Sequence, residues 1–190
     1  MSRKWRRSLA YVGLITLVVG LMPLQMKASD MKNFWPIIDQ SIVEAKGDPD
    51  QQIASLHMIL SRLDTKEVSE FIQSYEIAHA NAYSWNLWAA AYVINGGASD
   101  DGFAYFRDWL ISKGEGIYTK ALADPETLVG IAPAYESEFE EFRYVAVEVF
   151  ERKNAKFPEY NFDPSGDPSG TSWKEADVYA MYPKLTEYIR

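Results

Sequence analysis

Four charged residues near the middle of the chain could take part in acid–base chemistry: Asp100, Asp101, Arg107 and Asp108. Such chemistry needs two groups with separated proton affinities, and neighbouring carboxylates beside an arginine can provide them. The same residues also suit a structural role, because aspartates in the first turn of a helix interact favourably with its dipole and Asp–Arg pairs are common on helix surfaces. We favour the structural role and keep the catalytic one open.

Aromatic and amide side chains surround these charges in the sequence. Trp85, Trp88 and Tyr92 recur at the spacing of one helix face, which is typical of a packed core but also of an aromatic pocket or a protein-binding face. We expect these rings to pack in the core. If the region instead forms a site, its candidate binding residues are Trp85, Trp88, Asn95, Asp100, Asp101, Tyr105 and Arg107.

Two patterns resemble parts of metal sites, but neither is complete. Glu76 and His79 have the Glu-x-x-His spacing of di-iron helical bundles, which need two such pairs, and the chain has only two histidines. The repeated DPSG sequence at Asp163 and Asp167 alternates oxygen donors as a calcium loop does, but proline and lysine occupy positions that require glycine and glutamate. The chain has no cysteine, which excludes disulfides and thiolate ligands. We therefore expect no metal and no other cofactor.

The N-terminal segment, 1–30, differs in composition from the rest of the chain. A basic head precedes an uncharged run from Leu9 to Leu24, and a short polar tail follows it. This is the layout of a secretory signal, and the run is shorter than the roughly 20 residues that span a bilayer. We expect an exported protein, periplasmic or extracellular, which stays membrane-anchored if the segment is not cleaved. If Met31 is the true start, the protein is cytoplasmic.

The charge that lies outside this segment restricts the partners. The chain carries a net charge of −8, and since segment 1–30 holds five basic side chains and one acidic, the remainder carries −12. An acidic domain repels the phosphate backbone of nucleic acids and attracts basic surfaces. We expect no nucleic-acid partner, a basic protein as the candidate partner, and membrane contact only through the N-terminal segment.

Helical periodicity dominates the sequence after position 30, which predicts an all-α protein with a single compact domain of six to eight helices. We expect a signal segment or anchor over 1–30, a helical core over 31–157, and a turn-rich loop with a docked C-terminal segment over 158–190. The longest pattern, from Thr65 to Ile94, predicts one long tryptophan-rich central helix, on which Asn86 is expected to be a buried, hydrogen-bonded amide. A further helix is expected from Ser137 to Lys153.

Polar residues and glycines mark the expected helix ends. Asp48, Asp64 and Ser99 are expected to cap the helices that follow them, with Glu67 completing a capping box. The Asn95-Gly96-Gly97 sequence predicts a helix stop in the left-handed backbone region.

The run WNLWAAAYVINGGASDDGFAYFRDWLISKG, residues 85–114, resembles the signature of a bacterial family, the domain of unknown function 4240. The resemblance covers about residues 31–153, with Trp173 as a further match. It implies a helical bacterial domain. The family usually has cysteine where Ala98 stands, so a role for that thiol does not transfer to this chain. Because the family is functionally uncharacterised, the resemblance implies no catalytic residue.

The sequence leaves two functions open for this protein. We favour a non-enzymatic protein-binding domain of the inhibitor or immunity type, because no catalytic constellation is complete. The alternative is a small-molecule-binding or hydrolytic enzyme with its site in the helix-turn-helix corner between Asn95 and Arg107.

Overall fold

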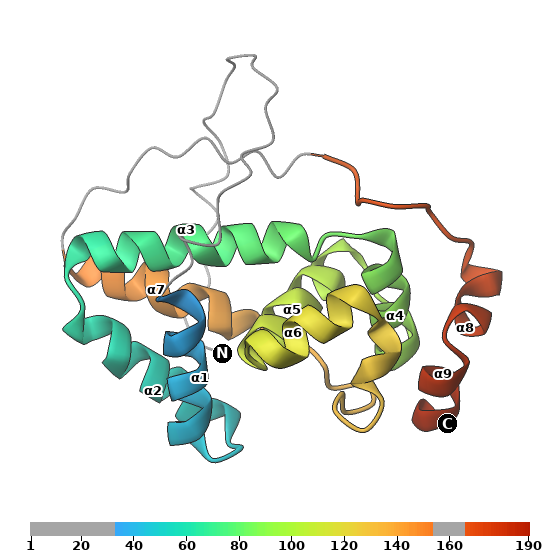
Figure 1. Ribbon diagram of the computed structural model, residues 1–190, viewed down its shortest axis with the longest axis horizontal. Helices are drawn as coiled ribbons and strands as arrows, with labels where there is room; N and C mark the ends of the chain where they lie inside the picture. Colours follow the sequence, from blue (N-terminus) through green and yellow to red (C-terminus); the bar gives the residue numbers. More distant parts are fainter. Residues whose placement is uncertain (1–32, 154–165) are drawn as a thin grey trace, which may run out of the picture.

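The computed structural model describes residues 33–153 and 166–190, and every regular element in these two ranges is helical (Figure 1). Nine α-helices lie within them, which confirms the all-α class and slightly exceeds the number expected. They are α1 Phe34–Ala45, α2 Pro49–Arg62, α3 Thr65–Asn81, α4 Trp85–Asn95, α5 Asp100–Ser112, α6 Glu115–Ala123, α7 Glu140–Arg152, α8 Val178–Met181 and α9 Pro183–Ile189. Two 3₁₀ turns, η3 Pro125–Leu128 and η4 Glu175–Asp177, complete the described elements.

The helix starts follow the local capping rules. The Asp48 carboxylate accepts hydrogen bonds from the first backbone amides of α2. Asp64 and Glu67 form a complete capping box at the start of α3, with both hydrogen bonds at 2.8 Å. Ser99 Oγ accepts from Gly102 N at the start of α5. These three caps are confirmed, because each depends only on residues within one turn of the helix start.

The expected single helix from Thr65 to Ile94 is wrong: the chain breaks it at Ala82–Ser84 into α3 and α4. Ser84 is extended and caps α4 by accepting from Leu87 N at 3.2 Å. The backbone on both sides of the break pairs with Ser169, which donates to Tyr83 O at 3.0 Å and accepts from Trp85 N at 2.9 Å. A distant segment thus satisfies the polar groups that a continuous helix would have paired internally.

One other helix boundary also differs from the sequence expectation. Helix α7 begins at Glu140 rather than at Ser137, because Ser137 is fully buried in the preceding loop, where its hydroxyl donates to Pro133 O. The Phe139 amide then donates to Tyr105 O at 3.1 Å. The loop before α7 is thus held to α5 and cannot continue the helix backwards.

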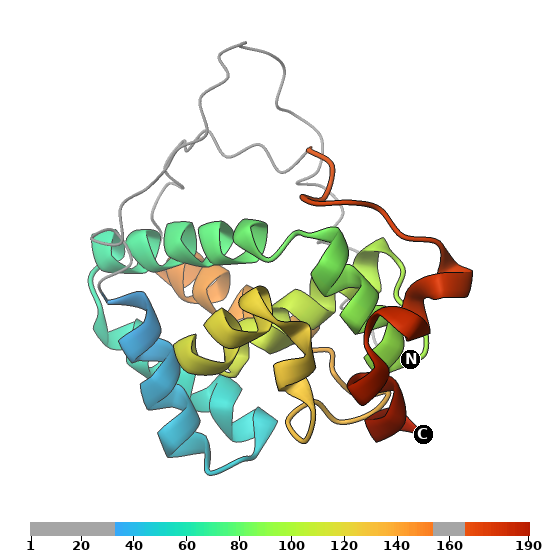
Figure 2. The ribbon, with the colours of Figure 1, turned by 45° about the vertical axis from the view of Figure 1, so that its right-hand side comes forward.

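Helix α3 crosses the molecule, with α5 and α7 packed against it (Figure 1). Helices α1 and α2 pair at one end of α3, and α4 stands at the other end with α8 and α9 on its outer side, as the rotated view also shows (Figure 2). The core between these helices is apolar and rich in phenylalanine, including the fully buried Phe34, Phe103, Phe106, Phe142 and Phe150.

The C-terminal helices are part of this core, because Val178 and Leu185 are fully buried. Within residues 33–153 and 166–190, no helix is long and apolar enough to cross a membrane. The basic and apolar segment expected to direct export, and Asp163 of the DPSG repeat, lie outside the described residues.

Candidate functional site

Two tryptophans of α4, Trp85 and Trp88, form a stack on one side of the helix. The Trp85 and Trp88 rings are stacked with centroids 5.3 Å apart, and Trp88 stacks in turn on Phe103 of α5 at 4.9 Å. The Trp88 indole nitrogen donates to Ala98 O at 3.0 Å. Trp88 therefore joins α4, the following turn and α5, and its partly buried ring packs against the core.

The Asn95-Gly96-Gly97 turn has two separate structural roles. The Asn95 side chain donates to Ser137 O at 3.3 Å and accepts from Ser137 N at 3.2 Å, which fastens the loop before α7 to the end of α4. Gly96 ends α4 in the left-handed region with φ of 69°, as predicted. A Cβ atom on Gly96 would also lie 2.7 Å from the ring of Tyr135, so the ring can pack there only against glycine.

The other candidate residues of the corner, three charged residues and a tyrosine, lie in different environments. Asp100 and Asp101 are exposed in the first turn of α5. The partly exposed Tyr105 side chain hydrogen-bonds Glu140. Arg107 is buried, donates to His79 O at 2.9 Å, and its guanidinium lies over the Tyr83 and Phe103 rings at 4.6 and 4.9 Å. The structure thus brings Trp85 and Trp88 together but does not gather the seven candidate residues around one cavity.

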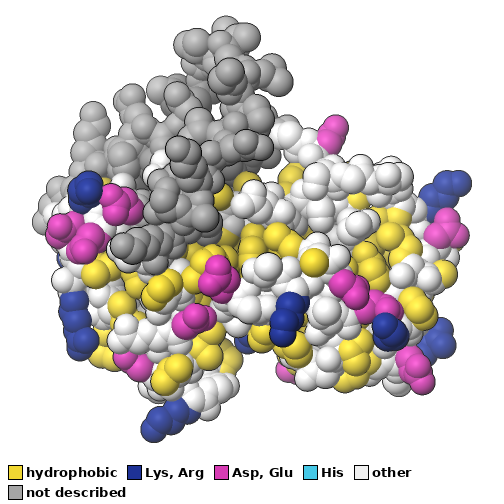
Figure 3. Space-filling view, in the orientation of Figure 1, with side chains coloured by type: hydrophobic (Ala, Val, Ile, Leu, Met, Phe, Trp, Pro, Cys, Tyr) yellow, Lys and Arg dark blue, Asp and Glu magenta, His cyan; other side chains and the backbone are white. Residues whose placement is uncertain are grey.

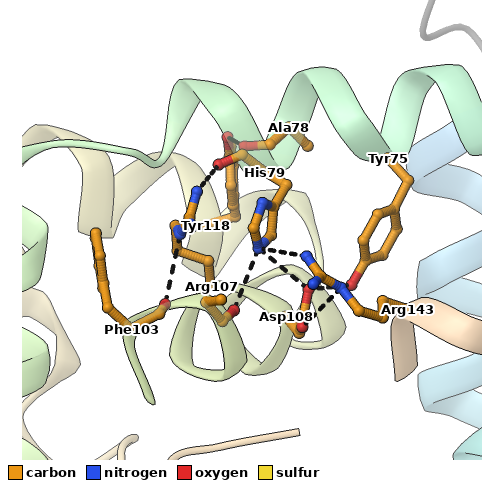
Figure 4. A network of polar contacts seen from close by, with 9 residues as sticks. Tyr75, Ala78, His79, Phe103, Arg107, Asp108, Tyr118 and Arg143 are labelled. Atoms are coloured by element: carbon orange, nitrogen blue, oxygen red, sulfur yellow. Dashed lines mark hydrogen bonds and ion pairs between the residues drawn. The ribbon is translucent and has the colours of Figure 1, made fainter. Parts of the chain in front are cut away.

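A different polar cluster lies in the interior, where α3, α5 and α7 meet (Figure 4). Asp108 of α5 is its centre and is fully buried. Its Oδ1 atom accepts a hydrogen bond of 2.8 Å from the Tyr75 hydroxyl and lies 3.3 Å from His79 Nε2. Its Oδ2 atom lies 3.2 Å from Arg143 Nε, an ion-pair contact without hydrogen-bond geometry. We call Tyr75, His79, Asp108 and Arg143 the buried cluster.

His79 Nε2 has more neighbours than it can bond at once. It lies 3.3 Å from Asp108 Oδ1, 3.2 Å from Ala104 O and 3.0 Å from Arg143 Nη2. A protonated Nε2 can donate to the two oxygens, whereas an unprotonated Nε2 can accept from the arginine. The hydrogen bonds of the buried cluster therefore depend on which imidazole tautomer is present.

Burial dominates the acid–base properties of the buried cluster. Burial, together with the nearby Arg107 and Arg143 guanidinium groups, lowers the pKa of His79 to about 3, so the imidazole is neutral at physiological pH. Burial raises the pKa of Asp108 to about 7, although Arg143 and the Tyr75 hydroxyl both favour the carboxylate. Burial also raises the pKa of Glu76, on α3 one turn from His79.

The arrangement can hold a proton near neutral pH, but it is closed to solvent. The side chains of Asp108 and His79 are 0% and 10% exposed, and neither residue lines a described pocket. No group of three or more potential metal ligands occurs within residues 33–153 and 166–190. Glu76 and His79 are therefore not part of such a group in this part of the chain.

His79 and Asp108 belong to separate motifs in the sequence, and Tyr75 and Arg143 were not predicted as their polar partners. One local signal was available, because Tyr75 and His79 are four residues apart and so lie on one face of α3. Arg143 gave none, since an arginine between the apolar positions of an amphipathic helix is typical of a solvated side chain.

A surface pocket of about 250 Å³ lies on the far side of the Gly96 turn. It is lined by Val93, Gly96, Tyr135, Tyr179, Thr186, Ile189 and Arg190. Tyr135 is 66% exposed and has a φ of 62°, a left-handed conformation that is unfavourable for a bulky residue. Such strain is found preferentially at binding and switch sites. A second pocket, of about 400 Å³, lies between α1 and α3.

The profile of a family described as "Protein of unknown function (DUF4240)" matches residues 30–152. The match covers well over half of the 190 residues, so the chain belongs to this family. It includes the corner and the buried cluster, and it ends before Trp173. No curated protein and no solved structure matches the chain.

Proposed function

We propose that the protein is a non-enzymatic binding domain that recognises another protein, in the manner of an inhibitor or immunity protein. The binding surface proposed is the pocket behind the Gly96 turn together with the tyrosines around it. We call this surface the tyrosine pocket, and define it by Gly96, Tyr135, Tyr179, Ile189 and Arg190.

The observation that carries this proposal is the exposure of two tyrosines at one pocket. Tyr135 and Tyr179 are 66% and 43% exposed, although each ring has a large apolar area. Tyrosine is enriched at the centres of protein interfaces, because a rigid ring contributes contact area and its hydroxyl a hydrogen bond. Neighbouring aromatic side chains with a pocket between them offer a place for a partner side chain to insert.

The proposed partner is a basic protein. Outside segment 1–30 the chain carries a net charge of −12, which increases the rate of association with a positively charged surface. On the face shown in Figure 3, acidic and basic side chains both lie among the hydrophobic ones over the part of the molecule where α8 and α9 stand, so the expected attraction comes from the net charge of the domain and not from an acidic patch there. We also propose that the basic and apolar N-terminal segment exports the domain, so the partner is sought outside the cytoplasm.

The test is a pull-down from the native cell envelope and culture medium at low and high salt. We expect a basic protein to bind the parent at low salt, to dissociate at high salt, and to be lost from Tyr179→Ala. Tyr144→Ala is the matched control, because Tyr144 is similarly exposed, at 46%, but lies on α7 and does not line the pocket. Equal capture by the parent and Tyr179→Ala would exclude the tyrosine pocket as the binding surface.

A small-molecule or hydrolytic site between Asn95 and Arg107 is the alternative, and one observation favours it. Asp108 and His79 form a carboxylate–imidazole pair directly beside Arg107, with a carboxyl pKa of about 7. The alternative requires α3, α5 and α7 to separate, because the pair is buried. A screen of ester and phosphoester substrates with Asp108→Asn as the inactive control tests it, and activity retained in that variant would eliminate it.

A further inference from the structure

The outer face of α4 is covered by a segment of the same chain, residues 167–177, which we call the strap; it runs without a helix as far as Lys174 and ends in the 3₁₀ turn η4 (Figures 1 and 2). The strap begins with backbone pairing: Ser84 and Ser169 form a parallel bridge, in which Ser169 donates to Tyr83 O and accepts from Trp85 N. Two backbone hydrogen bonds of this kind are how an added strand is held by a protein surface. The break between α3 and α4 makes these backbone groups available.

The single large apolar side chain of the strap is Trp173, and it lies against two aromatic residues of α4. Its ring meets Trp85 edge-on with centroids 6.2 Å apart and Tyr92 edge-on at 5.4 Å. Its indole nitrogen donates to Trp85 O at 2.9 Å. The favoured edge-to-face geometry and the hydrogen bond together fix the position and orientation of one tryptophan.

A carboxylate completes the recognition two residues after the tryptophan. The Tyr92 hydroxyl donates a hydrogen bond to Glu175 Oε1. Helix α4 itself contains no charged residue. The α4 face therefore recognises three features of the strap: an extended backbone, a tryptophan, and a carboxylate two residues further on.

The strap is held much less firmly than the helices that follow it. Pro168 is its only buried residue, Trp173 is partly buried, and the other strap residues are exposed. By contrast, Val178 of α8 and Leu185 of α9 are fully buried in the core. Segments with few buried apolar contacts open locally at a lower free energy than the core does. We therefore expect the strap to open at a lower free energy than α8 and α9 do.

We propose that the outer face of α4 is a peptide-binding groove for an extended segment of another polypeptide that carries a tryptophan followed two residues later by an acidic residue, and that the strap occupies this groove in cis. The groove residues Tyr83, Trp85 and Tyr92 all lie within the family match, whereas the strap lies beyond it. The groove and the tyrosine pocket use different residues but adjoin, because the Tyr92 and Tyr179 rings meet edge-on with centroids 6.2 Å apart. This proposal goes beyond the proposed function, and its test uses Trp173, which does not line the pocket, so the two can fail separately.

The strap competes with any external peptide. A tethered segment acts at an effective concentration in the millimolar range, so a free peptide displaces it only if its affinity is high or the strap is weakened. Removing the Trp173 side chain weakens the strap and leaves its place beside Trp85 and Tyr92 vacant.

The experiment uses the full chain with Trp173→Ala and a fluorescein-labelled peptide of the strap sequence DPSGTSWKEAD. By fluorescence anisotropy, the peptide is expected to bind Trp173→Ala at least about tenfold more tightly than it binds the parent. Tyr144→Ala is the control and is expected to bind no better than the parent. A peptide with alanine in place of its tryptophan is expected to lose the binding to Trp173→Ala.

Two results overturn the proposal. One is a Trp173→Ala protein that melts cooperatively but binds the peptide no better than the parent does. The other comes from hydrogen exchange of the unmodified chain, which does not depend on how well the variant folds. The Ser169 and Trp85 amides, which pair at the bridge, are expected to exchange faster than the amides in the middle of α4. If they exchange only through global unfolding, the groove does not open and the proposal fails.

Discussion

The Tyr75 hydroxyl donates a 2.8 Å hydrogen bond to Asp108 Oδ1, and both side chains are buried, although they belong to different helices far apart in the sequence. This contact joins α3 to α5, and Arg143 brings α7 to the other oxygen of the same carboxyl group. A single aspartate therefore connects the three helices that cross at the centre of the domain. Buried polar groups of this kind are costly to leave without partners, which gives the buried cluster measurable effects on stability.

Arg143→Met is expected to lower the free energy of unfolding by about 2–3 kcal/mol at pH 9, because it leaves an ionised, buried carboxyl group without its cationic partner, and by less at pH 7, where Asp108, with a pKa of about 7, can take up a proton instead. Urea denaturation followed by circular dichroism measures the change. The double variant Arg143→Met/Asp108→Asn serves as the control and is expected to regain part of the loss, since the amide carries no charge. A loss below about 1 kcal/mol for Arg143→Met at pH 9 would show that the ion pair has no net effect on folding.

His79→Gln is expected to change the pH dependence of stability at the acidic end. The pKa of His79 is about 3 in the folded chain and 6.5 unperturbed, so the unfolded chain binds the additional proton between these values and the parent loses stability as pH falls below 6.5. The glutamine variant lacks this loss. Its stability relative to the parent should therefore be about 2 kcal/mol higher at pH 5 than at pH 7.5. A difference that does not vary with pH contradicts this assignment.

Asp108→Asn is expected to have the opposite pH dependence. The pKa of Asp108 is about 7 in the folded chain and 3.8 unperturbed, so the folded chain binds the additional proton and the parent loses stability as pH rises from 3.8 to 7. Relative to the parent, the asparagine variant should be about 2–3 kcal/mol more stable at pH 7.5 than at pH 5. Urea midpoints at the two pH values measure this, and a shift of the opposite sign would contradict it.

Trp88→Ala and Asp101→Asn separate the packing and charge contributions of the family signature. Trp88 stacks between Trp85 and Phe103, and its truncation should cost about 3 kcal/mol or more. Asp101 is exposed in the first turn of α5, and its neutralisation should cost at most about 1 kcal/mol, the size of a helix-dipole interaction. Thermal melts compare the two. A Trp88→Ala protein as stable as the parent but unable to bind a partner would make the ring a recognition residue instead.

The sequence predicted those parts of the fold that local interactions determine. The caps at Asp48, Asp64 and Ser99, and the left-handed stop at Gly96, each involve residues within a few positions of one another. The break between α3 and α4 was missed because its cause is not local. The backbone on either side of the break pairs with the strap, which lies near the other end of the chain, and the residues at the break include no proline or glycine.

The buried cluster was missed for a related physical reason. Its members come from three helices, and only the packing of α3, α5 and α7 brings Asp108 to His79 and Arg143.

The prediction for Asn86 was wrong in the opposite direction: the apolar sequence around it predicted a buried amide, whereas its side chain is exposed on α4. The outer side of α4 near Asn86 lies under the C-terminal segment, where Tyr182 donates to the Asn86 carbonyl.

The contact between Gly96 and the Tyr135 ring determines the order in which the two positions can mutate. Alanine at position 96 meets both an unfavourable left-handed backbone and a ring 2.7 Å from its Cβ, whereas position 135 can lose its ring without disturbing the glycine. Neighbouring substitutions of this kind are not additive. Gly96→Ala should therefore cost less stability in a Tyr135→Asn background than in the parent. A lineage that replaces Gly96 is expected to have first replaced the tyrosine, and so to have lost one wall of the tyrosine pocket before the turn changed.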